Sequence, residues 1–180
     1  MTASIFIALL VLAVLLVYLV VAVQTWTQVH GTRVVTCPET NGPVAVRVDV
    51  PHALATAVWD QVDLRLTSCS RWPERQDCDQ PCVQQIEQAP SDTHPRTIAA
   101  HFFGRKRCAI CTRRIDPLSH MTLQPGFMHP VTHKVEAWDD LPAQDLPRAI
   151  ATSHPLCQHC TLAEMFRQKF PDRVTDRQPH

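Results

Sequence analysis

The sequence has only four glycines among its 180 residues, and each of them stands alone. Loops that bind nucleotide phosphates need several closely spaced glycines, so neither a dinucleotide-binding turn nor a P-loop is present. The chain also lacks a nucleophile elbow, a paired-carboxylate motif and an H-E-x-x-H motif. Its formal net charge is zero, with 17 basic and 17 acidic residues, which argues against steering of the whole chain toward nucleic acid. We therefore expect a protein that is not an enzyme.

Charge is also absent from the N-terminal segment, where residues 5–23 are uncharged and nearly all apolar. As a helix this segment spans about 28 Å, close to the roughly 30 Å of a bilayer's hydrocarbon core. It lacks the basic start and the small-x-small cleavage site of a signal peptide. We therefore predict a transmembrane anchor in the lipid bilayer. Arg33 and Arg47 follow the anchor and no basic residue precedes it, which favours a single-pass topology with a cytoplasmic soluble part.

Eight cysteines are present, and they form two sets of four separated by residues 83–107. The second set is two C-x-x-C pairs with 45 residues between them: Cys108, Cys111, Cys157 and Cys160. Two such pairs place four thiolates so that two tight turns can close one tetrahedral shell around a soft cation. Zinc suits this donor set best, because its bonds to sulfur are about 2.3 Å long and it needs no redox chemistry. We therefore predict a structural zinc site at these cysteines.

The second C-x-x-C pair runs directly into a helical pattern that extends to Phe170. Thr161 and Glu164 have the spacing of a capping box, and apolar residues follow at helical intervals. The free amides and partial positive charge of a helix N-terminus stabilise thiolates. A C-x-x-C turn, a hairpin and a C-x-x-C that opens a helix resemble the treble-clef class of zinc domains. The resemblance covers residues 108–170 and implies a zinc-binding fold.

The first set of cysteines is spaced less regularly, at Cys37, Cys69, Cys78 and Cys82. Asn41-Gly42 lies between two strand-like arms and predicts a hairpin that carries the first of these cysteines near its turn. Asp79 can cap a helix that would place the last of them at the helix start. We predict a second four-thiolate site here, covered by Trp72, and thus two zinc ions in all. The alternatives are buried small residues or a reactive thiol.

Two other chemistries could use these cysteines. Eight is an even number, and an oxidising compartment would allow disulfides, although paired C-x-x-C motifs and the basic residues after the anchor favour reduced, metal-bound thiols. Iron–sulfur clusters usually take a run of closely spaced cysteines, which neither set shows. Zinc is therefore the preferred interpretation, while iron and disulfides stay open.

Five basic residues surround the first C-x-x-C pair, within residues 105–107 and 113–114. One interpretation is a surface for phosphate groups or lipid headgroups. The other, which the sequence favours, is that they offset the double negative charge of a zinc–tetrathiolate centre. Interleaved aromatic residues on which nucleic-acid bases could stack are absent, so a nucleic-acid partner is not expected.

The chain as a whole predicts an α+β fold class, with a single transmembrane helix followed by two small zinc-stapled modules. Such small modules, in a chain with 15 prolines, bury little hydrophobic core and need an additional stabilising cross-link such as a bound metal ion. The predicted organisation is a transmembrane helix at 5–23, a linker at 24–32, a β-rich tetracysteine module at 33–92, a connecting helix at 93–106, a treble-clef-like zinc module at 107–170 and a flexible tail at 171–180.

Three functions are compatible with this organisation. The first, which we favour, is a membrane-anchored zinc-binding protein whose metal is structural and which acts as an interaction or assembly module in a membrane-associated complex. The second is a metal-handling or thiol-redox protein with exchangeable cysteines. The third is a periplasmic domain held together by disulfides. The first function requires a protein partner, and the sequence does not identify it.

Overall fold

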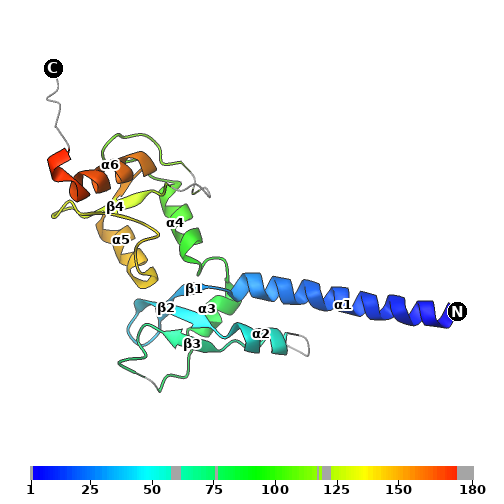
Figure 1. Ribbon diagram of the computed structural model, residues 1–180. Coiled ribbons are helices and arrows are strands. Elements are labelled where there is room, and N and C mark those ends of the chain that lie inside the picture. The colour runs from blue at the N-terminus through cyan, green and yellow to red at the C-terminus, as the bar shows by residue number, and fades with distance from the viewer. Residues whose placement is uncertain (1, 58–61, 76, 117, 119–122, 174–180) are drawn as a thin grey trace. The chain divides into compact units, whose positions relative to one another are not determined.

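The computed structural model describes residues 2–57, 62–75, 77–116, 118 and 123–173 (Figure 1). The chain divides into two compact units, Met1–Thr93 and His94–His180. Each unit combines helices with one three-stranded antiparallel sheet. The mixed α and β composition agrees with the predicted fold class. The division falls one residue after the end of the first predicted module.

Helix α1, Thr2–Val29, dominates the N-terminal part of the first unit (Figure 1). Its segment Ser4–Val29 is long and apolar enough to cross a membrane by length and composition, and none of its most apolar stretch is buried against the rest of the described chain. The helix continues through residues 24–29 of the predicted linker, and Thr25 and Val29 are buried near its end.

The sheet of the first unit has the order β1-β2-β3, with β1 at Thr32–Cys37, β2 at Gly42–Val48 and β3 at Leu66–Cys69. The predicted hairpin is confirmed, because β1 pairs with β2 and Cys37 lies opposite Gly42 at the end of the ladder. Asn41 precedes that glycine with a positive φ of 52°, a conformation that asparagine tolerates better than most residues.

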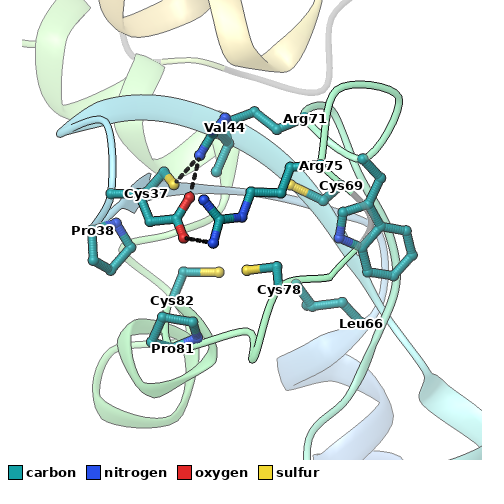
Figure 2. A pocket seen from close by; sticks show the side chains of 12 residues that line it. Cys37, Pro38, Val44, Leu66, Cys69, Arg71, Arg75, Cys78, Pro81 and Cys82 are labelled. Atoms are coloured by element: carbon teal, nitrogen blue, oxygen red, sulfur yellow. Dashed lines mark hydrogen bonds and ion pairs between the residues drawn. The ribbon is translucent and has the colours of Figure 1, made fainter.

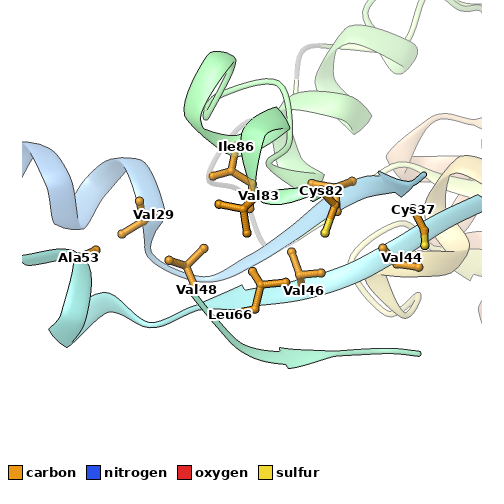
Figure 3. Close-up of a cluster of buried hydrophobic side chains, with 11 residues drawn as sticks. Val29, Cys37, Val44, Val46, Val48, Ala53, Leu66, Cys82, Val83 and Ile86 are labelled. Carbon is orange, nitrogen blue, oxygen red and sulfur yellow. The ribbon is translucent and has the colours of Figure 1, made fainter. Parts of the chain in front are cut away.

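Two short helices complete the first unit, α2 at Val50–Thr56 and α3 at Val83–Gln88. Helix α3 begins after Cys82, as predicted, but its N-cap residue is Cys82 itself and not Asp79. Figure 3 shows the core that these elements enclose. Its buried members are Val29, Val35, Cys37, Val44, Val46, Val48, Ala53, Leu66, Cys82, Val83 and Ile86. Two cysteines of the first set therefore belong to this core.

A buried arginine joins the end of helix α1 to the rest of its unit. Arg33 is 2% exposed, and its guanidinium donates to the backbone carbonyls of Gln28, His30 and Pro90. The first two carbonyls lie at the C-terminal end of the apolar helix, where carbonyls have no partner within the helix. Arg33 thus caps the helix and ties it to the segment that follows α3.

The second unit begins with helix α4, Pro95–Phe103, which occupies the central part of the predicted connecting helix. Its sheet has the order β5-β4-β6, with β4 at Gly126–Met128, β5 at Val135–Ala137 and β6 at His154–Leu156. A 3-10 turn at Ala143–Asp145 leads into helix α5, Leu146–Thr152. The core includes Phe103 against Phe127, whose ring centroids lie 5.0 Å apart.

Helix α6, Gln158–Lys169, follows strand β6 directly, with Cys157 as its N-cap residue. The predicted capping box at Thr161 is wrong, because the helix begins three residues earlier. Thr161 is instead buried within the first helical turns, and its hydroxyl donates to the Cys157 carbonyl at 3.0 Å. The predicted tail starts with a 3-10 turn at Pro171–Arg173, and residues 174–180 lie outside the described part of the chain.

Candidate metal centre

The first C-x-x-C pair forms a tight turn closed by backbone hydrogen bonds. The Cys108 amide donates to the Arg113 carbonyl, and the Thr112 amide donates to the Cys108 carbonyl, each at 2.9 Å. Thr112 has a positive φ of 60°, which lets the chain reverse direction after the second cysteine. An antiparallel bridge between Arg107 and Arg114 closes the base of the turn. The turn therefore directs its two thiols to one side.

The second pair lies at the junction of strand β6 and helix α6. Cys157 is the N-cap residue of the helix and Cys160 lies in its first turn, so the prediction that this pair opens a helix is confirmed. The Ala109 amide donates to the Pro155 carbonyl of β6 at 2.9 Å. This hydrogen bond joins the two cysteine pairs across the 45 residues that separate them in sequence.

The four sulfur atoms converge at this junction. The Sγ atoms of Cys108, Cys111, Cys157 and Cys160 all lie within 4.8 Å of one another, and the Sγ atoms of Cys111 and Cys157 are 3.7 Å apart. With zinc–sulfur bonds of about 2.3 Å, the edge of a regular tetrahedron of thiolates is about 3.8 Å. Two of the cysteines are buried and two are half-buried. The group has the geometry of a tetracysteine metal site.

Backbone amides and burial act in opposite directions on these thiols. Burial acts to raise the pKa of Cys108, but the backbone amides of Cys111, Cys157 and Ile110 outweigh it and lower the pKa to about 6. Burial and hydrogen bonds with the neighbouring thiols instead raise the pKa of Cys160. Burial also raises the pKa of Cys157. A cation that binds these sulfurs would therefore have to displace protons from the helix-side pair.

The first set of cysteines shares a pocket without converging to the same degree (Figure 2). All four line one cavity of about 20 Å³, which has room for about one water-sized species. Figure 2 shows the thiols of Cys78 and Cys82 pointing toward one another. Among the described residues, however, the group whose thiols lie close enough to hold a metal ion is the second set. A second metal site is therefore not established by the geometry.

The thiol of Cys37 instead faces a cation. The Arg71 guanidinium donates to the Cys37 Sγ at 2.9 Å and to Glu39 at 3.2 Å (Figure 2). Arg75 forms a second ion pair with Glu39, at 3.1 Å. Burial acts to raise the pKa of Cys37, but hydrogen bonds from Thr40, Glu39 and Arg71 outweigh it and lower the pKa to about 7. A substantial part of this thiol is therefore ionised at neutral pH.

Sequence reasoning missed the role of the two arginines in this pocket. They lie in residues 70–77, a segment whose Trp72 was expected to cover the first cysteine set, and that side chain does line the pocket. The spacing of Arg71 and Arg75 indicates only that they can share a partner. That partner, Glu39, is 32 positions away in the sequence, and no local pattern points to it.

No family model, curated protein or solved structure matches this chain at a significant level. The architectural resemblance to treble-clef domains thus receives no support from known proteins. What the chain does has to follow from its own residues, above all from the four converging thiols and the apolar helix α1.

Proposed function

We propose that the chain is a membrane-anchored zinc-binding protein in which the metal is structural. The observation that carries the proposal is the convergence of Cys108, Cys111, Cys157 and Cys160, whose Sγ atoms lie within 4.8 Å of one another. Four thiolates complete the tetrahedral shell of zinc and leave no position for a substrate or a reactive water. The proposed centre therefore supplies folding energy and not catalysis.

The packing of helix α6 supports a structural role for the metal. Thr161 is the one residue of this helix that is buried, although a free-standing helix of this length is marginal in water. A metal bound to Cys157 and Cys160 at its start would hold the helix against the C-x-x-C turn at Cys108. That turn, the β4–β5 hairpin and a C-x-x-C pair that opens α6 occur in the order expected for a treble-clef-like module.

The anchor in the proposal is helix α1. Its residues 5–23 are uncharged and span about 28 Å as a helix, close to the roughly 30 Å of the hydrocarbon core. We place the two units that follow on the cytoplasmic side, since Arg33 and Arg47 follow the span and a reducing compartment keeps thiols available to metal. A C-terminal reporter that is active only on the cytoplasmic side is the expected result, and activity only on the opposite side would refute this orientation.

A second zinc ion in the first unit is part of the same proposal. Its support is that Cys37, Cys69, Cys78 and Cys82 line one small cavity. Burial and the nearby sulfurs of the other three raise the pKa of Cys82 to about 11, as expected where thiols crowd one another. Zinc at this site would take over the thiolate of Cys37 that Arg71 now contacts.

The role of the metal-held units, in this proposal, is to bind a protein partner in a membrane-associated assembly. Leu162 and Phe166 of helix α6 support it, since their side chains are 50% and 48% exposed. They lie four positions apart and thus on one face of the helix. Large apolar side chains exposed together are a common feature of protein contact sites.

The metal content of the purified chain tests the proposal. We expect the full chain, extracted in detergent under reducing conditions, to hold two zinc ions by elemental analysis. The Cys108→Ser variant should hold one, and the Cys78→Ser variant should hold one as well. If the wild-type chain holds one zinc ion and only Cys108→Ser loses it, the zinc site of the first unit would be refuted and the site of the second unit would stand. An absence of metal together with four disulfides by mass would refute the proposal.

A metal-handling or thiol-redox function is the second candidate, and the contact between Arg71 and Cys37 favours it. A thiolate held by an arginine is a good nucleophile, whereas a zinc-bound thiolate is shielded. In this case Cys37 of the purified chain should react with iodoacetamide at neutral pH much faster than Cys82 does. The Arg71→Met variant should slow that reaction. Protection of all eight thiols until a chelator is added would instead support the structural function.

A further inference from the structure

A compact set of cations surrounds the first C-x-x-C turn of the second unit. Its five members, hereafter the basic turn surface, are all exposed: Arg105, Lys106, Arg107, Arg113 and Arg114. The antiparallel bridge between Arg107 and Arg114 holds the two ends of this surface together. Backbone hydrogen bonds of the turn and this bridge therefore hold the segment that carries the cations.

These cations have no carboxylate partners among the described residues. Among the described residues of the second unit, Lys134 pairs with Glu136 and Arg167 pairs with Glu164. Neither ion pair involves the basic turn surface. Arg107 donates to the backbone carbonyl of Thr112, and Lys106 lies over the Phe102 ring. The five positive charges are therefore not cancelled by neighbouring acidic side chains.

The thiols of the metal centre do not use these cations either. Their described hydrogen-bond donors are backbone amides and other thiols, as at Cys108. Even beside a zinc–tetrathiolate centre of charge −2, five cations leave a local excess of positive charge. The unit as a whole has the same sign, with twelve Lys and Arg against eight Asp and Glu in His94–His180. Neutralisation of the negative charge of the metal centre therefore does not account for the five cations of the basic turn surface.

An exposed aliphatic side chain lies within the same turn. Ile110, between the two cysteines, is 45% exposed, and Ala109 beside it is exposed as well. An apolar tip flanked by cations matches the interface of an anionic bilayer, where cations meet the headgroups and aliphatic groups enter the acyl boundary. Nucleic-acid surfaces that bind unpaired bases use aromatic side chains for stacking, and this turn has none.

From this combination we propose that the basic turn surface binds the headgroups of an anionic phospholipid bilayer, with Ile110 inserted at the interface. The proposal rests on the proposed function, because the metal would hold the turn in shape and helix α1 would attach the chain to the bilayer. It adds a second, salt-sensitive membrane contact to the anchor at helix α1. Each cation near an anionic surface strengthens attachment about fivefold.

Amide hydrogen exchange on the full chain in lipid vesicles tests the proposal. The chain is reconstituted in vesicles of phosphatidylcholine alone or of phosphatidylcholine and phosphatidylglycerol at three to one. We expect residues 105–114 to exchange several-fold more slowly in the anionic vesicles, and this protection should disappear at high salt. The double variant Arg113→Glu/Arg114→Glu should lose the protection. The control Lys169→Glu/Arg173→Glu, which makes the same change in net charge elsewhere in the unit, should keep it.

Zinc content measured on the same samples separates this proposal from the proposed function. Bound zinc with equal exchange in both vesicle types would overturn the membrane contact alone. Slow exchange in anionic vesicles without bound zinc would support the contact and refute the metal centre. Protection of residues 105–114 by added single-stranded RNA, but not by anionic lipid, would overturn the proposal in favour of a nucleic-acid partner.

Discussion

Replacing Cys160 by serine is the sharpest test of whether metal holds the second unit together. Cys160 lies in the first turn of helix α6, and its sulfur belongs to the group of four within 4.8 Å. Serine keeps the size of the side chain nearly unchanged but removes a thiolate ligand. We expect the variant to lose the zinc of the second unit and to release α6 from its sheet.

The expected loss of stability is large because few other interactions attach helix α6 to the rest of the second unit. Besides the buried Thr161 and the partly buried Met165, two glutamines attach the helix. Gln168 donates to the His133 carbonyl at 2.8 Å and accepts from the Val135 amide at 3.2 Å, and Gln158 donates to the Asp116 carboxylate at 3.0 Å. Three such hydrogen bonds contribute about 1.5–4.5 kcal/mol together. Structural zinc contributes about 10–16 kcal/mol, against roughly 5–15 kcal/mol for the whole stability of a typical domain. The loss of metal should therefore unfold the unit.

Limited proteolysis with zinc analysis provides the measurement. The Cys160→Ser variant should hold one zinc fewer per chain and should be cleaved between residues 107 and 170 under conditions that leave the wild type intact. The matched control is Cys37→Ser, which changes a cysteine of the first unit and should leave residues 107–170 resistant. A Cys160→Ser variant that stays resistant, with its zinc retained, would refute the closed structural centre.

Three further predictions concern protons, packing and the helix cap. Because burial and the neighbouring thiols raise the pKa of Cys160, zinc has to displace its proton, so zinc affinity should rise with pH and binding should release protons in calorimetry across several buffers. A Cβ on Gly126 would clash with the Glu136 carbonyl oxygen and with the Thr161 side chain. Gly126→Ala should therefore destabilise the second unit by about 1–3 kcal/mol in thermal unfolding, while Gly42→Ala, which meets only ordinary contacts, should have little effect. Arg33→Met removes the three hydrogen bonds that the buried guanidinium donates to backbone carbonyls, and it should destabilise the first unit by about 1–3 kcal/mol, whereas the same change at the exposed Arg47 should be nearly neutral.

Features that depend on neighbours along the chain were predictable from the sequence. The apolar run at 5–23 has no charge to interrupt it, and Asn41-Gly42 between β-like arms predicts the β1–β2 hairpin. The first C-x-x-C spacing likewise indicates the tight turn at Cys108 and Cys111, and the apolar periodicity after Cys160 indicates a helix. In each case a few consecutive residues determine the structural preference, because turn geometry and helical spacing are local properties.

Features that depend on distant residues were decided by the tertiary structure. The hydrogen bond from Ala109 to Pro155 brings the two C-x-x-C pairs together, whereas no comparable convergence gathers the first cysteine set. Arg71 reaches the Cys37 thiol across 34 positions, and Thr25 is buried near the end of α1. Such contacts leave no periodicity in the sequence. They arise because folding pairs buried polar groups and fills the core wherever the chain brings suitable partners into reach.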